Sequence, residues 1–456
     1  MARHQVSQLI LLAAVLGLAI LAAPGCGGSA NDLASPGNAP DSGDLALVDS
    51  DGGSRNAATV PPYPDNTATN ARSGGATTVF DISTEAFETA APNLNAADFA
   101  IHEEGNEAFE QEFFTAPATE HLGLGPVMNR ESCEACHAGD GRGRPPNPGE
   151  EVESMLLRLS IPGFDPITGG VIGAPGFGGQ LQDRCIPGSR EEAKIGLSYV
   201  EIPGNFGNGQ PYSLRKPTFT LVGPYIPAPA GLLISPRVAP SVFGLGLLEA
   251  IPSSVILARA DPFDQNHDGI SGRVNLVYNP ETNQKGIGRF GWKANTINLH
   301  VQSAAAYNND MGITSSVFSS ETCAGQSQDD HGGDDPELDD DTLDANAFYT
   351  STLGVPARRN INNNQIKRGE TVFQQSLCAK CHTPVTLTGS SAISNALSFQ
   401  RIQPFTDLLL HDMGPGLADN RPDFQATGQE WRTAPLWGMG LQETVNGHTN
   451  FLHDGR

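Results

Sequence analysis

The spacing of apolar residues divides this chain into segments of different kinds. An apolar run over residues 9–23 is too short to span a bilayer comfortably, and it predicts an export signal over residues 1–25. Residues 26–79 are rich in Gly, Ser, Asn, Asp, Ala and Pro and lack periodic apolar positions, which predicts a disordered tether. From residue 80 onward the density of apolar residues indicates a globular protein.

Within the globular part the periodicity changes along the chain. Residues 98–114 and 366–377 carry apolar side chains at helical spacing, which predicts two helices. Gly and Pro turns dominate residues 145–225, where we expect loops and a few short strands. Nine of the sixteen residues over 329–344 are acidic and none is Lys or Arg, so we expect a solvated acidic linker over residues 329–352.

Composition narrows the class of protein. The 456 residues include 27 Lys+Arg and 51 Asp+Glu, and the resulting net charge of -24 argues against nucleic acid as a partner. The length allows about two or three domains of roughly 100–200 residues each. Gly and Pro, with 52 and 34 copies, predict long irregular connections between helices.

Cys26 follows the apolar run and bears on localisation. It is a candidate for lipidation after cleavage of the signal, and ordinary cleavage nearby is the alternative. Both alternatives predict an exported protein, in the bacterial periplasm or tethered to a membrane as a lipoprotein. No later stretch is apolar enough to span a bilayer, so we expect membrane contact through a lipid anchor if at all.

Four of the seven cysteines form two copies of the pattern C-x-x-C-H: Cys133, Cys136 and His137 make the first copy, and Cys378, Cys381 and His382 make the second. This pattern attaches c-type haem, because two closely spaced thiols form thioethers to the porphyrin while the adjacent His binds the iron. Composition predicts roughly 0.003 copies by chance, so two copies are a strong signal. We therefore expect two covalent haems, with His137 and His382 as iron ligands.

Two other interpretations of these cysteines are weaker. A thioredoxin-like redox pair would not require a His after each second Cys, and a zinc site built from both pairs would leave the histidines unexplained. Subtracting the haem cysteines and Cys26 leaves Cys185 and Cys323, for which a disulfide is the economical hypothesis in an oxidising compartment. Two buried thiols or an intermolecular bridge are the alternatives.

A second pattern repeats after each haem motif. Residues 237–247 and 432–441 both contain R-x-A-P, two glycines and a final Leu, which suggests two related haem-binding halves. Arg237 and Arg432 are candidates for neutralising haem propionates, because Arg favours bidentate contacts with carboxylates. Ordinary ion pairing is the equal alternative for both.

Residues 264–272 match the start of a calcium-binding loop. Asp264, Asn266 and Asp268 present side-chain oxygens at alternate positions before a Gly, as hard cations require. The twelfth position is Asn275 instead of a bidentate Glu, so the loop departs from an EF-hand. We favour calcium here, with a metal-free Asx-rich turn as the alternative.

Several further segments resemble the di-haem oxidoreductase family of peroxidase-like proteins, relatives of bacterial di-haem cytochrome c peroxidases. The resemblance rests on G-L-G-P, Y-S-L-R-K-P, S-P-R-V-A-P, D-G-I-S-G-R, F-G-W-K-A, L-L-H-D-M-G and F-L-H-D-G-R, at residues 123–126, 212–217, 235–240, 268–273, 290–294, 409–414 and 451–456. It covers the chain from about residue 123 onward.

The resemblance implies a mainly α fold with two cytochrome c-like haem domains, long Gly/Pro-rich loops and a few short strands. We expect an N-terminal haem domain with the calcium-like loop over residues 80–328, and a C-terminal cytochrome c domain over residues 353–456. Relatives normally continue past the H-D-G-R segment, so this second domain is expected to be truncated.

The resemblance also implies how such a protein works. One haem feeds electrons to the other, where hydrogen peroxide or another small substrate is reduced, and a small redox protein donates the electrons. Arg237 and Glu249 are the implied catalytic residues, with a structural helix Glu as the alternative for Glu249. The alternative function is a non-catalytic periplasmic electron carrier.

The sixth iron ligands are less defined by the sequence. Met413 is the expected distal ligand of the second haem, with His411 and Met439 as other candidates, and Met311 is a candidate for the first haem. A Met in an apolar stretch is usually a core residue, so core packing is the alternative.

Overall fold

The computed structural model describes residues 71–115, 118, 121–147, 149–323, 325–328 and 336–456. Within them the α-helices are α1 (Ala96–Glu110), α2 (Leu245–Glu249), α3 (Ser253–Leu257), α4 (Leu299–Ala306), α5 (Asp340–Thr352), α6 (Asn364–Gln375) and α7 (Gln442–Asn446). The longer strands are β3 (Met155–Phe164), β6 (Lys194–Asn205), β7 (Pro211–Val222), β8 (Leu233–Val238), β9 (Leu276–Asn279) and β10 (Gln284–Ile287). Shorter strands are β1 (Thr78–Val79), β2 (Val127–Met128), β4 (Val171–Ile172), β5 (Arg184–Cys185), β11 (Val355–Pro356), β12 (Thr386–Leu387), β13 (Arg401–Ile402), β14 (Leu410–Asp412) and β15 (Glu430–Arg432).

The expectation of a mainly α fold is wrong. About 23% of the described residues are helical and 22% are strand or bridge, and the strands form several small sheets. Strand β8 pairs antiparallel with β3, which also pairs with β4, and the other described sheets have two strands each. The predicted helix over residues 366–377 is confirmed as α6, and the one over 98–114 is confirmed as α1, which ends at Glu110.

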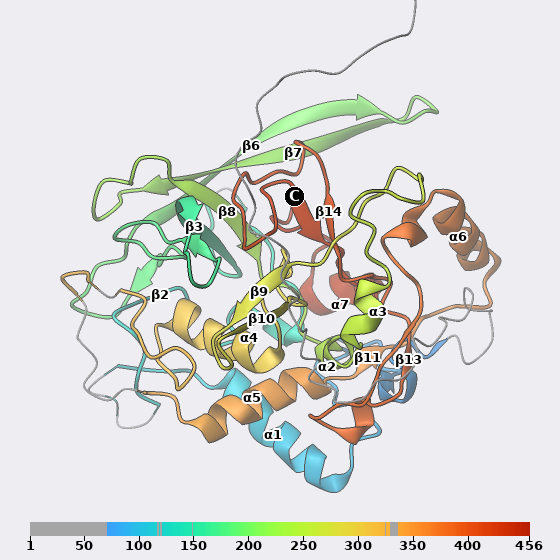
Figure 1. Cartoon of the computed structure of the whole chain (residues 1–456), viewed down its shortest axis with the longest axis horizontal. Coiled ribbons are helices and arrows are strands. Elements are labelled where there is room, and N and C mark those ends of the chain that lie inside the picture. Colours follow the sequence, from blue (N-terminus) through green and yellow to red (C-terminus); the bar gives the residue numbers. More distant parts are fainter. Residues whose placement is uncertain (1–70, 116–117, 119–120, 148, 324, 329–335) are drawn as a thin grey trace, which may run out of the picture. The chain divides into compact units, whose positions relative to one another are not determined.

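Residues 145–225 contain the expected loops and short strands, but they also hold the longest strands of the described structure. Strands β6 and β7 pair along twelve residues each and run side by side as a hairpin (Figure 1). Pro203, Pro211 and Pro217 lie within these strands. A two-stranded ribbon tolerates them because each strand has one edge without a ladder partner, where a missing N–H costs nothing. Proline content therefore misled the sequence analysis.

The acidic segment is also more ordered than expected. From Asp340 onward it forms helix α5, whose N-cap Asp339 accepts a hydrogen bond from the Thr342 amide at 2.8 Å. Asp340 and Asp341 occupy the first turn, where negative charge is favoured by the helix dipole. Asp339, Asp340 and Asp341 thus begin a helix and do not belong to a loop.

Helices α1 and α5 lie side by side (Figure 1) and pack closely. Gly105 of α1 faces the Ala345 carbonyl of α5, and a Cβ at Gly105 would overlap that oxygen. The absence of a side chain therefore sets the distance between the two helices. The buried side chains of α5 include Leu343 and Tyr349, which belong to two neighbouring clusters of the hydrophobic core.

The parts of the chain that we expected to form separate haem domains are joined in several places. Strand β1 pairs parallel with β11, although residues 75–79 were expected to belong to the disordered tether. The main core combines residues such as Phe87, Leu248 and Trp437. The domain boundaries at 80–328 and 353–456 stay predictions.

The expected signal over residues 1–25 and the lipidation site Cys26 lie outside the described residues. Among the described residues, no helix has the length and apolar character needed to cross a membrane.

Candidate functional site

The first C-x-x-C-H motif lies in a tight turn that is fastened to helix α1. The Cys133 carbonyl oxygen accepts hydrogen bonds from the amides of Cys136 at 3.1 Å and His137 at 3.0 Å. The Phe109 carbonyl of α1 accepts a bond from the Glu134 amide at 3.3 Å. The Phe109 ring centroid lies 6.2 Å from that of His137. The helix therefore fixes the turn from both its backbone and a side chain.

The second motif follows helix α6 directly. Leu377 has φ 62, a left-handed conformation that ends the helix, and Cys378–Lys380 then forms a short 3-10 turn. The Cys378 carbonyl accepts a bond from the His382 amide at 2.9 Å. Phe373 of α6 places its ring centroid 6.4 Å from that of His382. Each motif thus has a phenylalanine from a nearby helix beside its histidine.

Both histidines are oriented in the same way. Nδ1 of His137 lies 2.8 Å from the Pro240 carbonyl oxygen, and Nδ1 of His382 lies 2.9 Å from that of Phe405. A carbonyl can only accept, so each Nδ1 carries the hydrogen and Nε2 is left as the nitrogen for a metal. Burial lowers the pKa of His137 to about 4, which keeps its imidazole neutral at pH 7.

The two motifs line one cavity of about 740 Å³. Its wall includes all six predicted attachment residues, namely Cys133, Cys136, His137, Cys378, Cys381 and His382. The cavity is lined mostly by apolar atoms, and aromatic residues such as Phe243, Trp292 and Trp437 contribute to it. The structure therefore brings together the residues that the sequence analysis assigned to two haems.

The two repeated arginines also lie in this wall. Arg432 donates from Nε to the Gly291 carbonyl at 2.9 Å, and its buried Nη1 has no hydrogen-bond partner among the described residues. Burial lowers the pKa of Arg432 to about 10, so it stays charged at pH 7. A buried cation with an unused donor fits a haem propionate. Arg237 lies 3.5 Å from Asp419 and 3.8 Å from Asp423, so it already has two carboxylate partners, which it shares with Lys293 and Arg421.

A buried charged cluster beside the cavity was missed by the sequence analysis. Lys293 Nζ donates to Asp419 Oδ1 at 2.8 Å and lies 4.5 Å from the centre of the Trp431 ring. Trp431 also stacks on His453, with ring centroids 3.7 Å apart. Burial lowers the pKa of Lys293 to about 8. Lys293 and His453 belong to the F-G-W-K-A and F-L-H-D-G-R segments, which were the available signal.

The candidate distal ligands of both haems all line the cavity. Met413 and Met439 line the cavity, as does Met311, the candidate for the first haem. His411 lines it too, but Nε2 of this histidine lies 2.8 Å from Asp407 Oδ2.

The other ring nitrogen of His411 is also engaged, because Nδ1 lies 2.9 Å from the Ser271 carbonyl oxygen. The same nitrogen is 3.6 Å from Cys381 Sγ. Burial opposes a charge on His411, but the bonds to Asp407 and Cys381 outweigh it and raise the pKa of His411 to about 10.

Glu249 has a structural partner. Its Oε2 accepts a hydrogen bond from the Leu299 amide at 2.8 Å, at the first residue of helix α4. The described residues that line the cavity do not include Glu249. Burial raises the pKa of Glu249, and the Leu299 bond opposes that shift. The predicted catalytic role of Glu249 remains a prediction.

The calcium-like loop turns its side chains toward its own backbone. Asp264 Oδ1 accepts a bond from the Asp268 amide at 3.0 Å, and Asn266 Oδ1 accepts one from the same amide at 2.9 Å. Asp268 Oδ2 pairs with Lys380 Nζ at 3.0 Å. Among the described residues, no group of three or more His, Cys, Asp or Glu could hold a metal ion.

The proposed disulfide is not formed in the structure. Cys185 has a free thiol whose sulfur lies 3.3 Å from the Ser189 carbonyl oxygen. Cys323 is buried.

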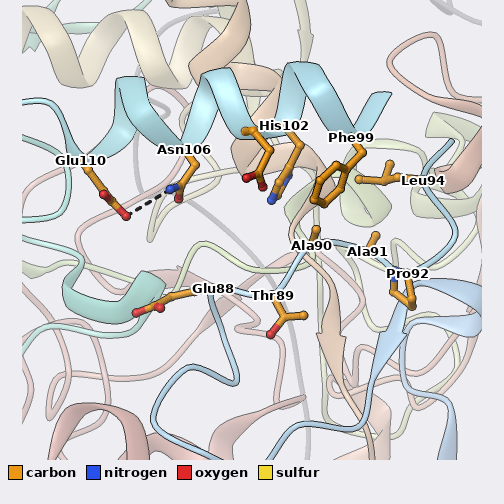
Figure 2. A pocket seen from close by; sticks show the side chains of 11 residues that line it. Glu88, Thr89, Ala90, Ala91, Pro92, Leu94, Phe99, His102, Asn106 and Glu110 are labelled. Atoms are coloured by element: carbon orange, nitrogen blue, oxygen red, sulfur yellow. Dashed lines mark hydrogen bonds between the residues drawn. The ribbon is translucent and has the colours of Figure 1, made fainter. Parts of the chain in front are cut away.

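A separate pocket of about 530 Å³ lies beside helix α1 and holds none of the predicted site residues. Figure 2 shows His102, Asn106 and Glu110 on the helix facing Glu88 and Thr89. Asn106 donates to Glu110 at 3.2 Å, and His102 Nδ1 lies 2.8 Å from Thr352 Oγ1. Burial lowers the pKa of His102 to about 4, so this histidine is neutral at pH 7.

Comparison with protein families finds a match described as "Di-haem oxidoreductase, putative peroxidase" over residues 67–456. Comparisons with curated proteins and with solved structures found no match. The family match spans the described cavity, both C-x-x-C-H motifs and both repeated arginines. The chain therefore belongs to the di-haem oxidoreductase family.

Proposed function

We propose that this protein is an exported di-haem c-type oxidoreductase that reduces hydrogen peroxide or another small oxidant. The observation that carries the proposal is the single cavity faced by both C-x-x-C-H motifs. Two redox groups held in one cavity are close enough to exchange electrons, as family membership also suggests.

The attachment residues supply the thiols and histidines for two haems. Cys133 with Cys136, and Cys378 with Cys381, offer the thiols for thioether bonds. Arg432 offers its unused Nη1 to a propionate. When bound, haem iron supplies the one-electron chemistry that peroxide reduction requires.

The protein's own groups prepare this site. The Pro240 and Phe405 carbonyls hold His137 and His382 in the tautomer that leaves Nε2 available. Near the first motif, Gln180 Nε2 donates to Asp310 Oδ1 at 2.6 Å, and both residues line the cavity. These side chains provide polar contacts for a small substrate within a largely apolar space.

The remaining parts of the proposal rest on the sequence. The apolar run over residues 9–23 supports export, and Cys26 supports a lipid anchor as the link to a membrane. A small redox protein is the proposed electron donor, and the charge of -24 argues against nucleic acid. Calcium in the loop of Asp264, Asn266 and Asp268 is proposed from its spacing, and removal by a chelator should lower the thermal stability of the holoprotein.

The proposal is tested on holoprotein matured with a c-type attachment system. Pyridine haemochrome and intact mass should give two covalent haems per chain. Optical and EPR spectra of the half-reduced protein should contain a high-spin haem that binds cyanide, and peroxide should be consumed faster than by free haem.

Fewer than two haems would overturn the covalent assignment. Two six-coordinate, low-spin haems in every redox state would overturn peroxide reduction and favour an electron carrier. A single-haem variant, Cys378→Ala/Cys381→Ala, is the matched control for turnover that requires both haems.

A further inference from the structure

The outer part of the β6–β7 hairpin, residues 200–214, is exposed on both faces and is called the hairpin tip below. Every residue of the tip except Gly204 is exposed. Five large apolar side chains are among them, with exposed fractions between 38% and 60%: Val200, Ile202, Phe206, Tyr212 and Leu214. Water therefore contacts a continuous apolar ribbon.

The base of the same hairpin is covered. Ile195, Phe219 and Leu221 pack against a buried cluster that includes Leu157 and Phe177. The tip is held by the pairing between its own strands, and an isolated two-stranded hairpin is marginally stable in water. A contact that buries the tip would gain the apolar burial that the tip lacks in the free chain.

The strand register places the exposed apolar side chains on one face of the hairpin. Val200 pairs with Lys216, Ile202 with Leu214, and Gly204 with Tyr212, and directly paired residues share a face. At the end of the hairpin the Phe206 and Tyr212 rings pack with their centroids 4.8 Å apart. The face therefore runs from an aromatic end through aliphatic residues to a lysine.

Charged residues are absent from the end of the hairpin and appear toward its base. The thirteen residues over 202–214 include no Asp, Glu, Lys, Arg or His, although 17% of the chain is charged. Arg215 lies over the Tyr199 ring at 4.4 Å, so Lys216 is the cation on the outward face. An uncharged apolar end followed by a cation matches the order of a bilayer surface, where acyl chains lie below anionic headgroups.

A second copy of the chain fits the tip less well. The prolines at 203, 211 and 217 remove N–H donors that edge-to-edge strand pairing would use.

We propose that the hairpin tip inserts into the interfacial region of a lipid bilayer, with Phe206 and Tyr212 among the upper acyl chains and Lys216 at anionic headgroups. The five residues from Ile202 to Phe206 span about 13 Å at the rise of a strand, which is enough to enter the interface. The contact is independent of the haem chemistry and would orient the protein on a membrane.

The test measures binding of the full-chain holoprotein to vesicles of phosphatidylcholine with 30% phosphatidylglycerol, by co-sedimentation. All variants carry Cys26→Ser, which removes the thiol for an acyl chain and keeps the N-terminus identical. Phe206→Asp/Leu214→Asp should lower the partition coefficient by at least about tenfold, because two buried apolar groups become charged. Lys216→Gln should lower it about fivefold on these vesicles and leave binding to pure phosphatidylcholine unchanged.

The matched control is Phe263→Asp/Ile167→Asp, which changes two apolar residues that are 81% and 77% exposed outside the hairpin. It should bind as the parent does. Soret spectra and thermal transitions of all variants establish that they are folded. Equal binding by the parent and the Phe206→Asp/Leu214→Asp variant would overturn the proposal. Sedimentation that shows a parent dimer and a monomeric tip variant would overturn it in favour of a second copy.

Discussion

The two C-x-x-C-H motifs share a pattern but differ in their surroundings. The first lies against the hydrophobic core, where Cys133 packs on two clusters and Phe109 is 3% exposed. The second follows α6, a helix without buried residues, and Cys378 is exposed. The two motifs therefore offer the same donor groups, and the rest of the chain determines how far each motif is buried.

Removing the thiols from each motif in turn is the strongest test of the difference between the two environments. Cys133→Ala/Cys136→Ala and Cys378→Ala/Cys381→Ala should each lower the haem content from two to one. The first variant should lose more than about 10 °C in Tm and the second less than about 5 °C, because an unfilled space in the core costs more than one near the surface. Haemochrome assays and calorimetry measure both effects. Equal losses of Tm would show that the two environments do not differ in stability.

The buried charged cluster beside the cavity tests whether burial determines how much an ion pair stabilises the fold. Asp419→Asn leaves Lys293 and Arg237 without their nearest carboxylate, and it should lower the free energy of unfolding by about 3 kcal/mol. Chemical denaturation measures the change. As a control, Glu150→Gln removes the exposed pair with Arg144 and should leave stability unchanged. A similar loss in both variants would contradict the importance of burial.

A series of unfolding measurements at different pH values tests the pairing of His411 with Asp407 beside the second motif. The pKa of His411 is raised to about 10 in the folded chain, so its pairing with Asp407 stabilises the fold fully below about pH 6.5. That stabilisation is lost as the pH rises toward 10. Asp407→Asn should therefore cost about 2 kcal/mol at pH 6 and progressively less at higher pH. A difference between parent and variant that does not vary with pH would exclude this charge pair.

The smallest expected effect concerns Glu249, in the part of the chain that carries the first motif. Glu249→Gln keeps the bond to the Leu299 amide, so peroxide turnover by the holoprotein should change less than threefold. A general acid or base would instead be worth about 100-fold or more. Steady-state rates with the Glu249→Gln variant distinguish the two roles, and a 100-fold fall would restore the catalytic assignment.

Local sequence patterns predicted the parts of the site that are local. The family is confirmed, as is helix α6 before Cys378. The cluster of Lys293, Asp419 and Trp431 could not be predicted, because its members are far apart in the sequence and meet only in the folded chain.

The errors in the predicted fold also arise where local sequence does not decide the structure. Prolines in β6 and β7 suggested loops, but a strand edge without a partner accepts them. The carboxylates before residue 344 suggested a solvated linker, but those at Asp339, Asp340 and Asp341 cap and begin α5. In each case the residue type was compatible with two structures, and tertiary packing selected between them.

The pairing of β1 with β11 has a consequence for biogenesis. Near this pair, the Ala76 amide bonds the Gln400 side chain 324 residues later. Because a chain is synthesised from its N-terminus, β1 cannot complete these contacts until the residues that follow β11, as far as Gln400, have been made. Cys133 and Cys136 are consequently made more than 200 residues before β1 can pair, so the first motif exists for a time without the finished fold around it.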